Sequence, residues 1–260
     1  MSETRTYDFV KDDLAPEAKR ANWEVAFGLQ KMDGLEPSRY MRDLAKAHIE
    51  GERSYAQVSQ EISRYYQEGG GAGDAPERTE EADIVADAIY GILADEAFRF
   101  DIPTLKSYHR RLFEQLDTAV YYPGEFRTVN LTKKEPVLDG RSVQYQDYGV
   151  IEESLAYDFE EERKQDYLAM DFSEKVARLA TFISRIWQVH PFYEGNTRTT
   201  AVFIEKYLMS MGYKIDNELL GQHAREFRDA LVLANYTNIP EGIKANPGKL
   251  QEFVAEMLRQ

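Results

Sequence analysis

The sequence of 260 residues contains no cysteine, which excludes disulfide bonds, thiolate metal sites, iron–sulfur clusters and thiol catalysis together. No apolar run approaches the roughly 20 residues of a membrane span, and the first residues have no apolar core of signal-peptide length. Basic residues are scarce, with 32 Lys and Arg against 46 Asp and Glu and a formal net charge of −14. Nucleic acids and anionic membranes are bound mainly by cationic surfaces, so we expect a protein that binds neither directly. The lack of a membrane span and of a signal peptide leads us to expect a cytoplasmic protein.

Apolar residues repeat at the helical period through most of the chain, which predicts an all-α fold. Proline lies at or just before three of the expected helix starts, where its missing N–H costs little. The expected helices cover residues 16–32, 38–50, 54–66, 79–98, 104–116, 171–190, 197–211, 222–234 and 247–258.

One region departs from the helical pattern. Between Thr128 and Tyr148, β-branched and aromatic residues flank the dipeptide Asp139-Gly140. Asp-Gly between two such runs is a strong hairpin signal. We therefore expect one exposed β-hairpin on the all-α body.

Glycine is concentrated between Glu68 and Pro76, at a density that a helix does not tolerate. This stretch predicts a linker at residues 69–77. The linker would divide a small module at residues 1–68 from a larger body at residues 78–260. Three helices are marginal for independent stability, so we expect the module to lean on the body, as a regulatory module would.

The most informative stretch is HPFYEGNTRTT, residues 190–200, which joins the end of one expected helix to the start of the next. A helix start presents unpaired N–H groups and the positive end of the helix dipole. The backbone from Gly195 to Thr199 is therefore suited to bind phosphate. Asn196 and Arg198 add side-chain donors beside it.

Two further groups in this stretch suggest chemistry. Glu194 supplies the hard oxygen that Mg²⁺ prefers, and Mg²⁺ needs few protein ligands when it also binds phosphate. An unperturbed histidine side chain is largely neutral at cellular pH, so His190 is suited to be a general base. Together these residues indicate transfer from a nucleotide onto a hydroxyl.

Each of these residues also has an ordinary structural explanation. A histidine at a helix end is often a cap or a packing residue, an isolated Glu or Arg is often solvated, and Gly-Asn is a common turn. Their concentration within nine residues at one helix–loop–helix joint favours a functional site.

The segment HPFYEGNTR resembles the signature of Fic-domain proteins, His-Pro-Phe-x-(Asp/Glu)-Gly-Asn-(Gly/Lys)-Arg, and departs from it only at Thr197. The segment GEFRTVNLTKKEPVLDGRSVQY resembles the stretch that carries the β-hairpin flap of that family. FRDALVLANY resembles its C-terminal helix. The resemblance covers roughly residues 78–257.

This resemblance implies a protein adenylyltransferase that moves AMP from ATP to a Tyr, Ser or Thr hydroxyl of a target protein. The flap would pair with an extended segment of the target, although its residues also fit a solvated edge. The implied roles are general base for His190, Mg²⁺ ligand for Glu194, anion hole for Gly195, Asn196 and Thr197, phosphate contact for Arg198, and target docking for Thr132, Lys133 and Lys134.

One departure concerns the nucleotide. Many relatives that transfer AMP carry a second arginine three positions after the first, where this chain has Ala201. Either another cation, Arg225 or Arg228, holds ATP, or the nucleotide or reaction differs. The alternatives are a Fic-type transferase or phosphodiesterase that uses another nucleotide, and a catalytically silent interaction module.

The N-terminal part also carries a resemblance. LQKMDGLEPSRYMRDLAKAHIEGERS is similar to the small three-helix antitoxin that inhibits Fic toxins, whose motif is (Ser/Thr)-x-x-x-Glu-(Gly/Asn). In register, Gly34 fits, Asp33 keeps the charge on a shorter side chain, and Leu29 lacks the hydroxyl. The resemblance implies inhibition through Asp33 and Gly34. Toxin–antitoxin relatives suggest type II topoisomerase subunits as one candidate target.

Overall fold

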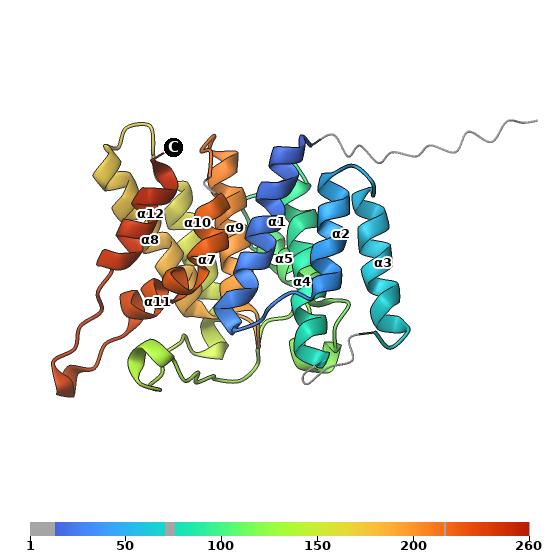
Figure 1. Ribbon diagram of the computed structural model, residues 1–260. Helices are drawn as coiled ribbons and strands as arrows, with labels where there is room; N and C mark the ends of the chain where they lie inside the picture. Colours follow the sequence, from blue (N-terminus) through green and yellow to red (C-terminus); the bar gives the residue numbers. More distant parts are fainter. Residues whose placement is uncertain (1–13, 71–75, 216, 260) are drawn as a thin grey trace, which may run out of the picture.

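The computed structural model describes residues 14–70, 76–215 and 217–259. Apart from isolated β-bridges their regular secondary structure is helical, which confirms the predicted all-α class (Figure 1). Short 3₁₀ turns lie at Lys31–Asp33, Pro136–Leu138, Tyr148–Val150 and Ile239–Glu241. The α-helices are α1 (Pro16–Gln30), α2 (Arg39–Ile49), α3 (Tyr55–Gln67), α4 (Pro76–Ala94), α5 (Ile102–Phe113), α6 (Thr118–Tyr121), α7 (Ile151–Arg163), α8 (Phe172–Val189), α9 (Asn196–Ser210), α10 (Asn217–Gln222), α11 (Ala224–Asn235) and α12 (Gly248–Leu258).

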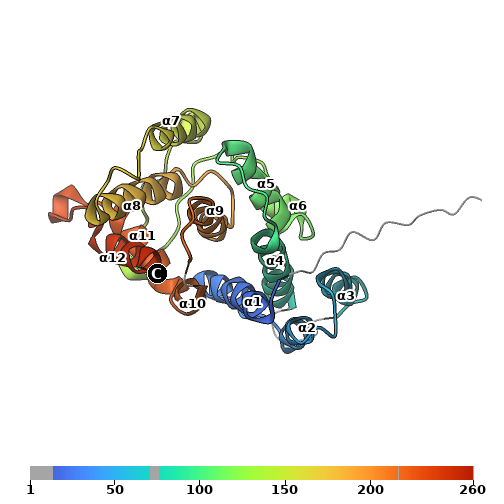
Figure 2. The ribbon, with the colours of Figure 1, turned by 90° about the horizontal axis from the view of Figure 1, so that it is seen from above.

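Helix α9 lies at the centre of the molecule. Figure 2 shows it ringed by α1, α4, α5, α8 and α10. Every residue from Asn196 to Leu208 is buried, so this helix has no solvated face. Its buried polar residues, which include Thr199 and Glu205, break the amphipathic pattern that surface helices show. The site that begins at Asn196 is therefore anchored in the core.

Helix α1 forms one wall of this ring, between α4 and α10 (Figure 2). Its residues Trp23, Val25 and Leu29 are at most 1% exposed. Gly28 faces Gly221 so closely that a Cβ atom on Gly28 would lie 2.2 Å from the carbonyl oxygen of Gly221. The first helix is thus part of the same hydrophobic core as the expected catalytic body.

Helices α2 and α3 lie at the periphery, beside α1 and α4 (Figure 2). Side-chain hydrogen bonds tie α3 to α4, from Ser59 Oγ to Asp87 at 2.7 Å and from Tyr66 Oη to Asp83 at 2.7 Å. Residues 71–75 of the predicted linker lie outside the described residues. Helix α4 already begins at Pro76, inside the range predicted for the linker.

The predicted β-hairpin between Thr128 and Tyr148 is not seen, because the described residues contain no strand. The Asp139-Gly140 turn is present, but it closes only one isolated antiparallel bridge, between Glu135 and Arg141. Pro136 directs the chain into a 3₁₀ turn. On the two arms that flank this turn, backbone N–H groups bind side chains instead of a partner strand. The Lys133 N–H, for example, donates to Ser142 Oγ at 3.0 Å. We call residues 128–148 the flap loop below.

Three helices were not expected from the sequence: α6, α7 and α10. Helix α7 buries Ile151, Leu155 and Phe159 at i, i+4 and i+8, a helical stripe within a strongly acidic segment. In the part of the chain that the structure describes, no helix combines the length and apolar character needed to cross a membrane.

Candidate functional site

His190 ends α8 in the left-handed conformation, with φ 48° and ψ 58°. Few non-glycine residues adopt these angles, and histidine is one of those found there more often. Its Nδ1 lies 3.3 Å from the Trp187 carbonyl oxygen, so Nδ1 carries the proton and donates. This assignment leaves the Nε2 lone pair as the free acceptor of a neutral ring.

Burial is the main reason for the low proton affinity of this ring. Together with the positive charges of Lys133, Arg127 and Arg228, burial lowers the pKa of His190 to about 3, although the hydrogen bond to Trp187 opposes the shift. The Tyr145 ring stacks on the imidazole with centroids 3.9 Å apart. His190 is therefore held neutral and fixed in orientation in this conformation.

Arg127 fixes the backbone on which His190 sits. Its Nε donates to the His190 carbonyl at 2.7 Å. Its two terminal nitrogens donate to the carbonyls of Val129 at 2.6 Å and Gln146 at 2.5 Å, near the two ends of the flap loop. One buried guanidinium thus joins the histidine to both arms of that loop.

Gly195 begins α9 and adopts φ 69°. A Cβ atom there would lie 2.1 Å from Phe113 Cζ, so no other residue fits. No side chain caps the start of α9. The first-turn N–H groups, which have no acceptor within a helix, remain available to an anion.

The loop between the two helices is closed by Asn196 and His109. The Asn196 amide accepts from the Phe192 N–H at 2.9 Å and donates to the Phe192 carbonyl at 2.8 Å. The His109 ring stacks on Phe192, with Nε2 3.1 Å from the Glu194 carbonyl oxygen, while Nδ1 accepts from the Gly124 N–H. Burial lowers the pKa of His109 to about 3, so this ring is also neutral.

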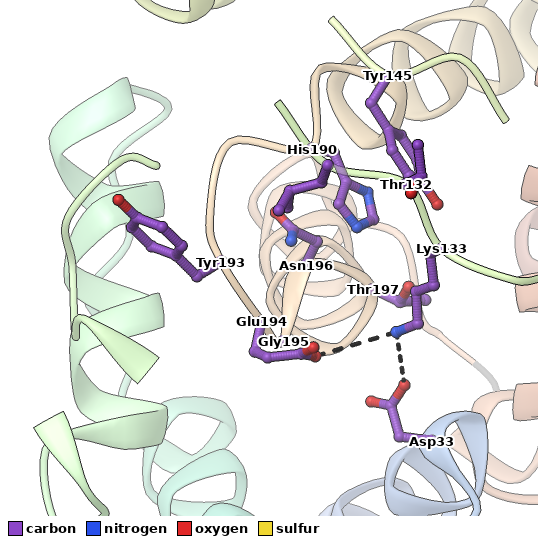
Figure 3. A pocket seen from close by; sticks show the side chains of 11 residues that line it. Asp33, Thr132, Lys133, Tyr145, His190, Tyr193, Glu194, Gly195, Asn196 and Thr197 are labelled. Carbon is purple, nitrogen blue, oxygen red and sulfur yellow. Dashed lines mark hydrogen bonds and ion pairs between the residues drawn. The ribbon is translucent and has the colours of Figure 1, made fainter. Parts of the chain in front are cut away.

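These elements surround one cavity of about 100 Å³, shown in Figure 3. It brings together most of the residues singled out from the sequence. Its lining comprises Asp33, Leu131, Thr132, Lys133, Tyr145, His190, Tyr193, Glu194, Gly195, Asn196 and Thr197. Gly34 and Lys134 line a second cavity. The Arg198 side chain is buried and lines neither of these two cavities.

Glu194 is the candidate metal ligand, and its side chain is 49% exposed. The Lys133 ammonium lies 4.0 Å from Glu194 Oε2 and 3.5 Å from Asp33 Oδ1, so a cationic group already sits beside this carboxylate (Figure 3). No cluster of three or more potential metal-ligating side chains occurs in the described parts of the chain. A single carboxylate fits Mg²⁺ that takes its other ligands from phosphate and water.

Arg198 is 1% exposed and is surrounded by acceptors. Its Nη2 pairs with Glu81 at 2.6 Å, its Nε lies 3.0 Å from Asp33 Oδ2, and its Nη1 donates to Gln30 Oε1 at 3.1 Å. The guanidinium also lies over the Phe113 ring, 5.2 Å from the centroid. The predicted phosphate contact is thus surrounded by protein acceptors, although its Nε makes no hydrogen bond of good geometry.

Asp33 ends the short 3₁₀ turn that follows α1, and Gly34 takes φ 69°. Arg78 Nη2 donates to the carbonyls of Asp33 and Gly34 at 3.1 and 3.2 Å. Burial opposes ionisation of Asp33, but Arg198, Lys133 and Arg228 outweigh it and hold the pKa of Asp33 below its usual range. The carboxylate therefore stays charged at the mouth of the site.

Sequence reasoning missed several residues that shape the site because they lie far from residues 190–198. His109, Arg127 and Tyr145 fix the loop and the histidine, and Gln30 and Glu81 hold Arg198. Single residues of these types carry no local pattern. Arg127 and Tyr145 lie within the segment that resembles the flap stretch, but the sequence alone gave neither of them a role.

Comparison with known proteins finds similarity in the central part of the chain. Residues 99–208 match the family model described as the Fic/DOC family. A stretch of 120 residues is 30% identical to protein adenylyltransferase VbhT of Bartonella schoenbuchensis. The match covers 45% of this chain and 23% of VbhT, so it spans under a quarter of that relative.

Solved structures show the same fold. A Fic-domain signalling protein from Bacteroides thetaiotaomicron has a TM-score of 0.55 at 17% identity, over 95% of this chain and 88% of that one. The N-terminal Fic domain of a Bartonella quintana effector with bound ADP has a TM-score of 0.55 at 21% identity, covering 71% and 86%. BepC of Bartonella tribocorum with bound AMPPNP has a TM-score of 0.54 at 16% identity, covering 71% and 87%.

Proposed function

We propose that the chain is a protein adenylyltransferase that transfers AMP from ATP to a protein hydroxyl, because residues 99–208 match the Fic/DOC family model. The observation that carries this proposal is the convergence of His190, the start of α9 and Glu194 on one cavity. The name of VbhT and the nucleotides in the two Bartonella structures support it.

In the proposed reaction, the hydroxyl oxygen of a target Tyr, Ser or Thr attacks the α-phosphorus of ATP. The new O–P bond forms as the bond from the α-phosphorus to the oxygen bridging to the β-phosphate breaks, and pyrophosphate leaves. His190 Nε2 accepts the hydroxyl proton, as its Nδ1 contact to Trp187 allows. Backbone N–H groups from Gly195 to Thr197 and the Arg198 guanidinium bind the phosphates.

Mg²⁺ held by Glu194 would offset the negative charge of the phosphates. The flap loop supplies the docking edge for the target. Among the described parts of the chain, residues 128–134 make no backbone–backbone hydrogen bond. The Thr128 and Lys133 N–H groups and the Val129 carbonyl bind side chains, and the other backbone groups of the segment are open to an extended peptide. Thr132 and Lys133 line the cavity beside this edge, and Lys134 lies just outside it.

The described conformation is a restrained one in this proposal. Its cavity of about 100 Å³ is smaller than the roughly 300–1,000 Å³ typical of small-molecule sites. Asp33 occupies the space beside Arg198, and Lys133 the space beside Glu194. Removing α1 would also strip Trp23 and Leu29 from the core, so a point substitution at Asp33 tests the restraint more cleanly than truncation.

A second candidate is a Fic-type transferase or phosphodiesterase that acts on another nucleotide. Ala201 favours it, because this buried position provides no charge for a terminal phosphate. A panel of α-labelled nucleoside triphosphates separates the candidates. Labelling by ATP in preference to the others supports AMP transfer.

The test of the proposed reaction uses the full chain, Mg²⁺ and ATP labelled at the α- or γ-phosphate. We expect protein-bound label from the α-position that is lost in His190→Ala, with type II topoisomerase subunits as the first added targets. Label from the γ-position would indicate a kinase-like reaction. Absence of label from every nucleotide, also in Asp33→Ala, would indicate a silent interaction module.

A further inference from the structure

The Asp33 carboxylate lies among three cations that come from three different elements. Arg198 of α9 lies 3.0 Å from Oδ2, while Arg228 of α11 lies 3.2 Å and Lys133 of the flap loop 3.5 Å from Oδ1. The carboxylate side chain is only 16% exposed. Each cation also has one other carboxylate neighbour, Glu81, Glu135 or Glu194. Without Asp33, however, the cationic groups that now face it would lack an acceptor in a poorly solvated place, which favours another anion.

Asp33 also separates two cavities. The first, of about 100 Å³, contains His190 and the start of α9. The second, of about 500 Å³, contains Arg228 and Lys134 on the other side of the Lys31–Gly34 turn. Asp33 is the residue that lines both. Withdrawal of its side chain would open a path from the histidine to Arg228.

Arg228 is held in position before any ligand arrives. Its Nη2 pairs with the buried Glu135 at 2.9 Å, and its Nη1 donates to the Met32 carbonyl at 2.6 Å. Its side chain is 12% exposed. A guanidinium fixed in this way loses little conformational entropy when it binds an oxyanion.

The neighbouring Arg225 does not share this arrangement. It lines the second cavity too, but its side chain is exposed, and its Nε donates to the Lys31 carbonyl at 3.1 Å and not to the Asp33 carboxylate. Helix α9 offers no alternative, because Ala201 is 1% exposed and uncharged. Of the two arginines considered for this role from the sequence, only Arg228 contacts Asp33.

We propose that Arg228 binds the terminal phosphoryl group of a nucleoside triphosphate once Asp33 is displaced, and so selects triphosphates over diphosphates. The two Asp33 oxygens stand in for phosphoryl oxygens between Arg198 and Arg228 in the described conformation. This inference rests on the proposed function, in that the nucleotide occupies the cavity beside His190.

The experiment measures the dissociation constants of ATP and ADP with Mg²⁺ by calorimetry in the full chain carrying Asp33→Ala. Arg228→Met alone would leave Glu135 buried and unpaired, so the comparison is between Glu135→Gln and Glu135→Gln with Arg228→Met. Because a hydrogen bond to a charged group contributes about 1.5–3 kcal/mol, loss of Arg228 should weaken ATP binding about tenfold or more. ADP binding should change less than about threefold.

Two further variants sharpen the test. Arg225→Met should leave the ratio of the two constants unchanged, and Arg228→Lys, which keeps a cation for Glu135, should give an intermediate ratio. Equal losses for ATP and ADP, or no loss for ATP, would overturn the assignment. So would failure of Asp33→Ala to bind either nucleotide. Nucleotide binding needs no turnover. A chain that distinguishes ATP from ADP as expected but transfers no α-label would therefore refute the proposed reaction and not the role of Arg228.

Discussion

The loop at residues 190–198 and the turn at residues 31–34 face the same cavity but are held in different ways. Between His190 and Arg198, which have charged partners, the loop is fixed by neutral contacts: Gly195 against Phe113, and the Asn196 amide on the Phe192 backbone. The turn is held largely by charge, through Asp33 and the cations around it. Packed contacts fix one geometry, whereas ion pairs can be exchanged for those of an anionic ligand.

The largest effect should come from Gly195→Ala, compared with Gly34→Ala. Both glycines have φ 69°, but a Cβ on Gly195 would lie 2.1 Å from Phe113, whereas nothing lies closer than 3.7 Å to one on Gly34. We expect Gly34→Ala to cost about 1–2 kcal/mol of unfolding free energy, the cost of the left-handed conformation alone. Gly195→Ala should cost clearly more and abolish transfer. Equal losses of unfolding free energy in the two variants, measured by chemical denaturation, would contradict the difference between the loop and the turn.

The neutral character of the loop can be tested by pH titration. Because the pKa values of His109 and His190 are lowered to about 3, both rings are neutral above that value. We expect their imidazole NMR signals to stay constant between about pH 5 and 8. A lowered carboxyl pKa also keeps Asp33 charged through this range, so acidification to about pH 5 should not release the turn. A midpoint near 6.5 for either ring would contradict this account.

The smallest effect should come from Lys133→Met. Lys133 is 34% exposed and its ion pairs are long, so the unfolding free energy should change by less than about 0.5 kcal/mol. Loss of its charge should nevertheless raise the pKa of His190, because Lys133 is one of the causes that lower it. Lys134→Met, at the second cavity, serves as the control, in an NMR titration extended below pH 5 toward the lowered pKa of His190. An unchanged His190 pKa would contradict the claim that the charge of Lys133 lowers it.

The loop at residues 190–198 could be predicted from the sequence because its candidate functional residues are contiguous. His190, Glu194 and Arg198 lie within one helix–loop–helix joint, and the flanking helices follow clear apolar periods. The helix positions of the N-terminal segment were also predictable, although the burial of α1 in the central ring was not. Periodicity identifies an apolar face and does not say which element covers it.

The flap loop and the cations around Asp33 could not be predicted in the same way. Asp139-Gly140 correctly marked a turn, but whether a ladder forms depends on the partners of the backbone, and Lys133 N–H binds a side chain. Arg228 reaches Asp33 across 195 positions of sequence. Such a contact depends on tertiary packing and leaves no mark on local spacing.

The most direct test of the account is the rate of auto-modification by α-labelled ATP in the full chain and in Asp33→Ala. Asp33→Asn, which keeps the shape but removes the charge, separates electrostatic from steric restraint, and Asp33→Ala with His190→Ala is the inactive control. Because coupling between sites typically amounts to 1–3 kcal/mol, we expect Asp33→Ala to raise the rate about 5- to 150-fold. Equal rates in the full chain and in Asp33→Ala would contradict the claim that this carboxylate restrains the site.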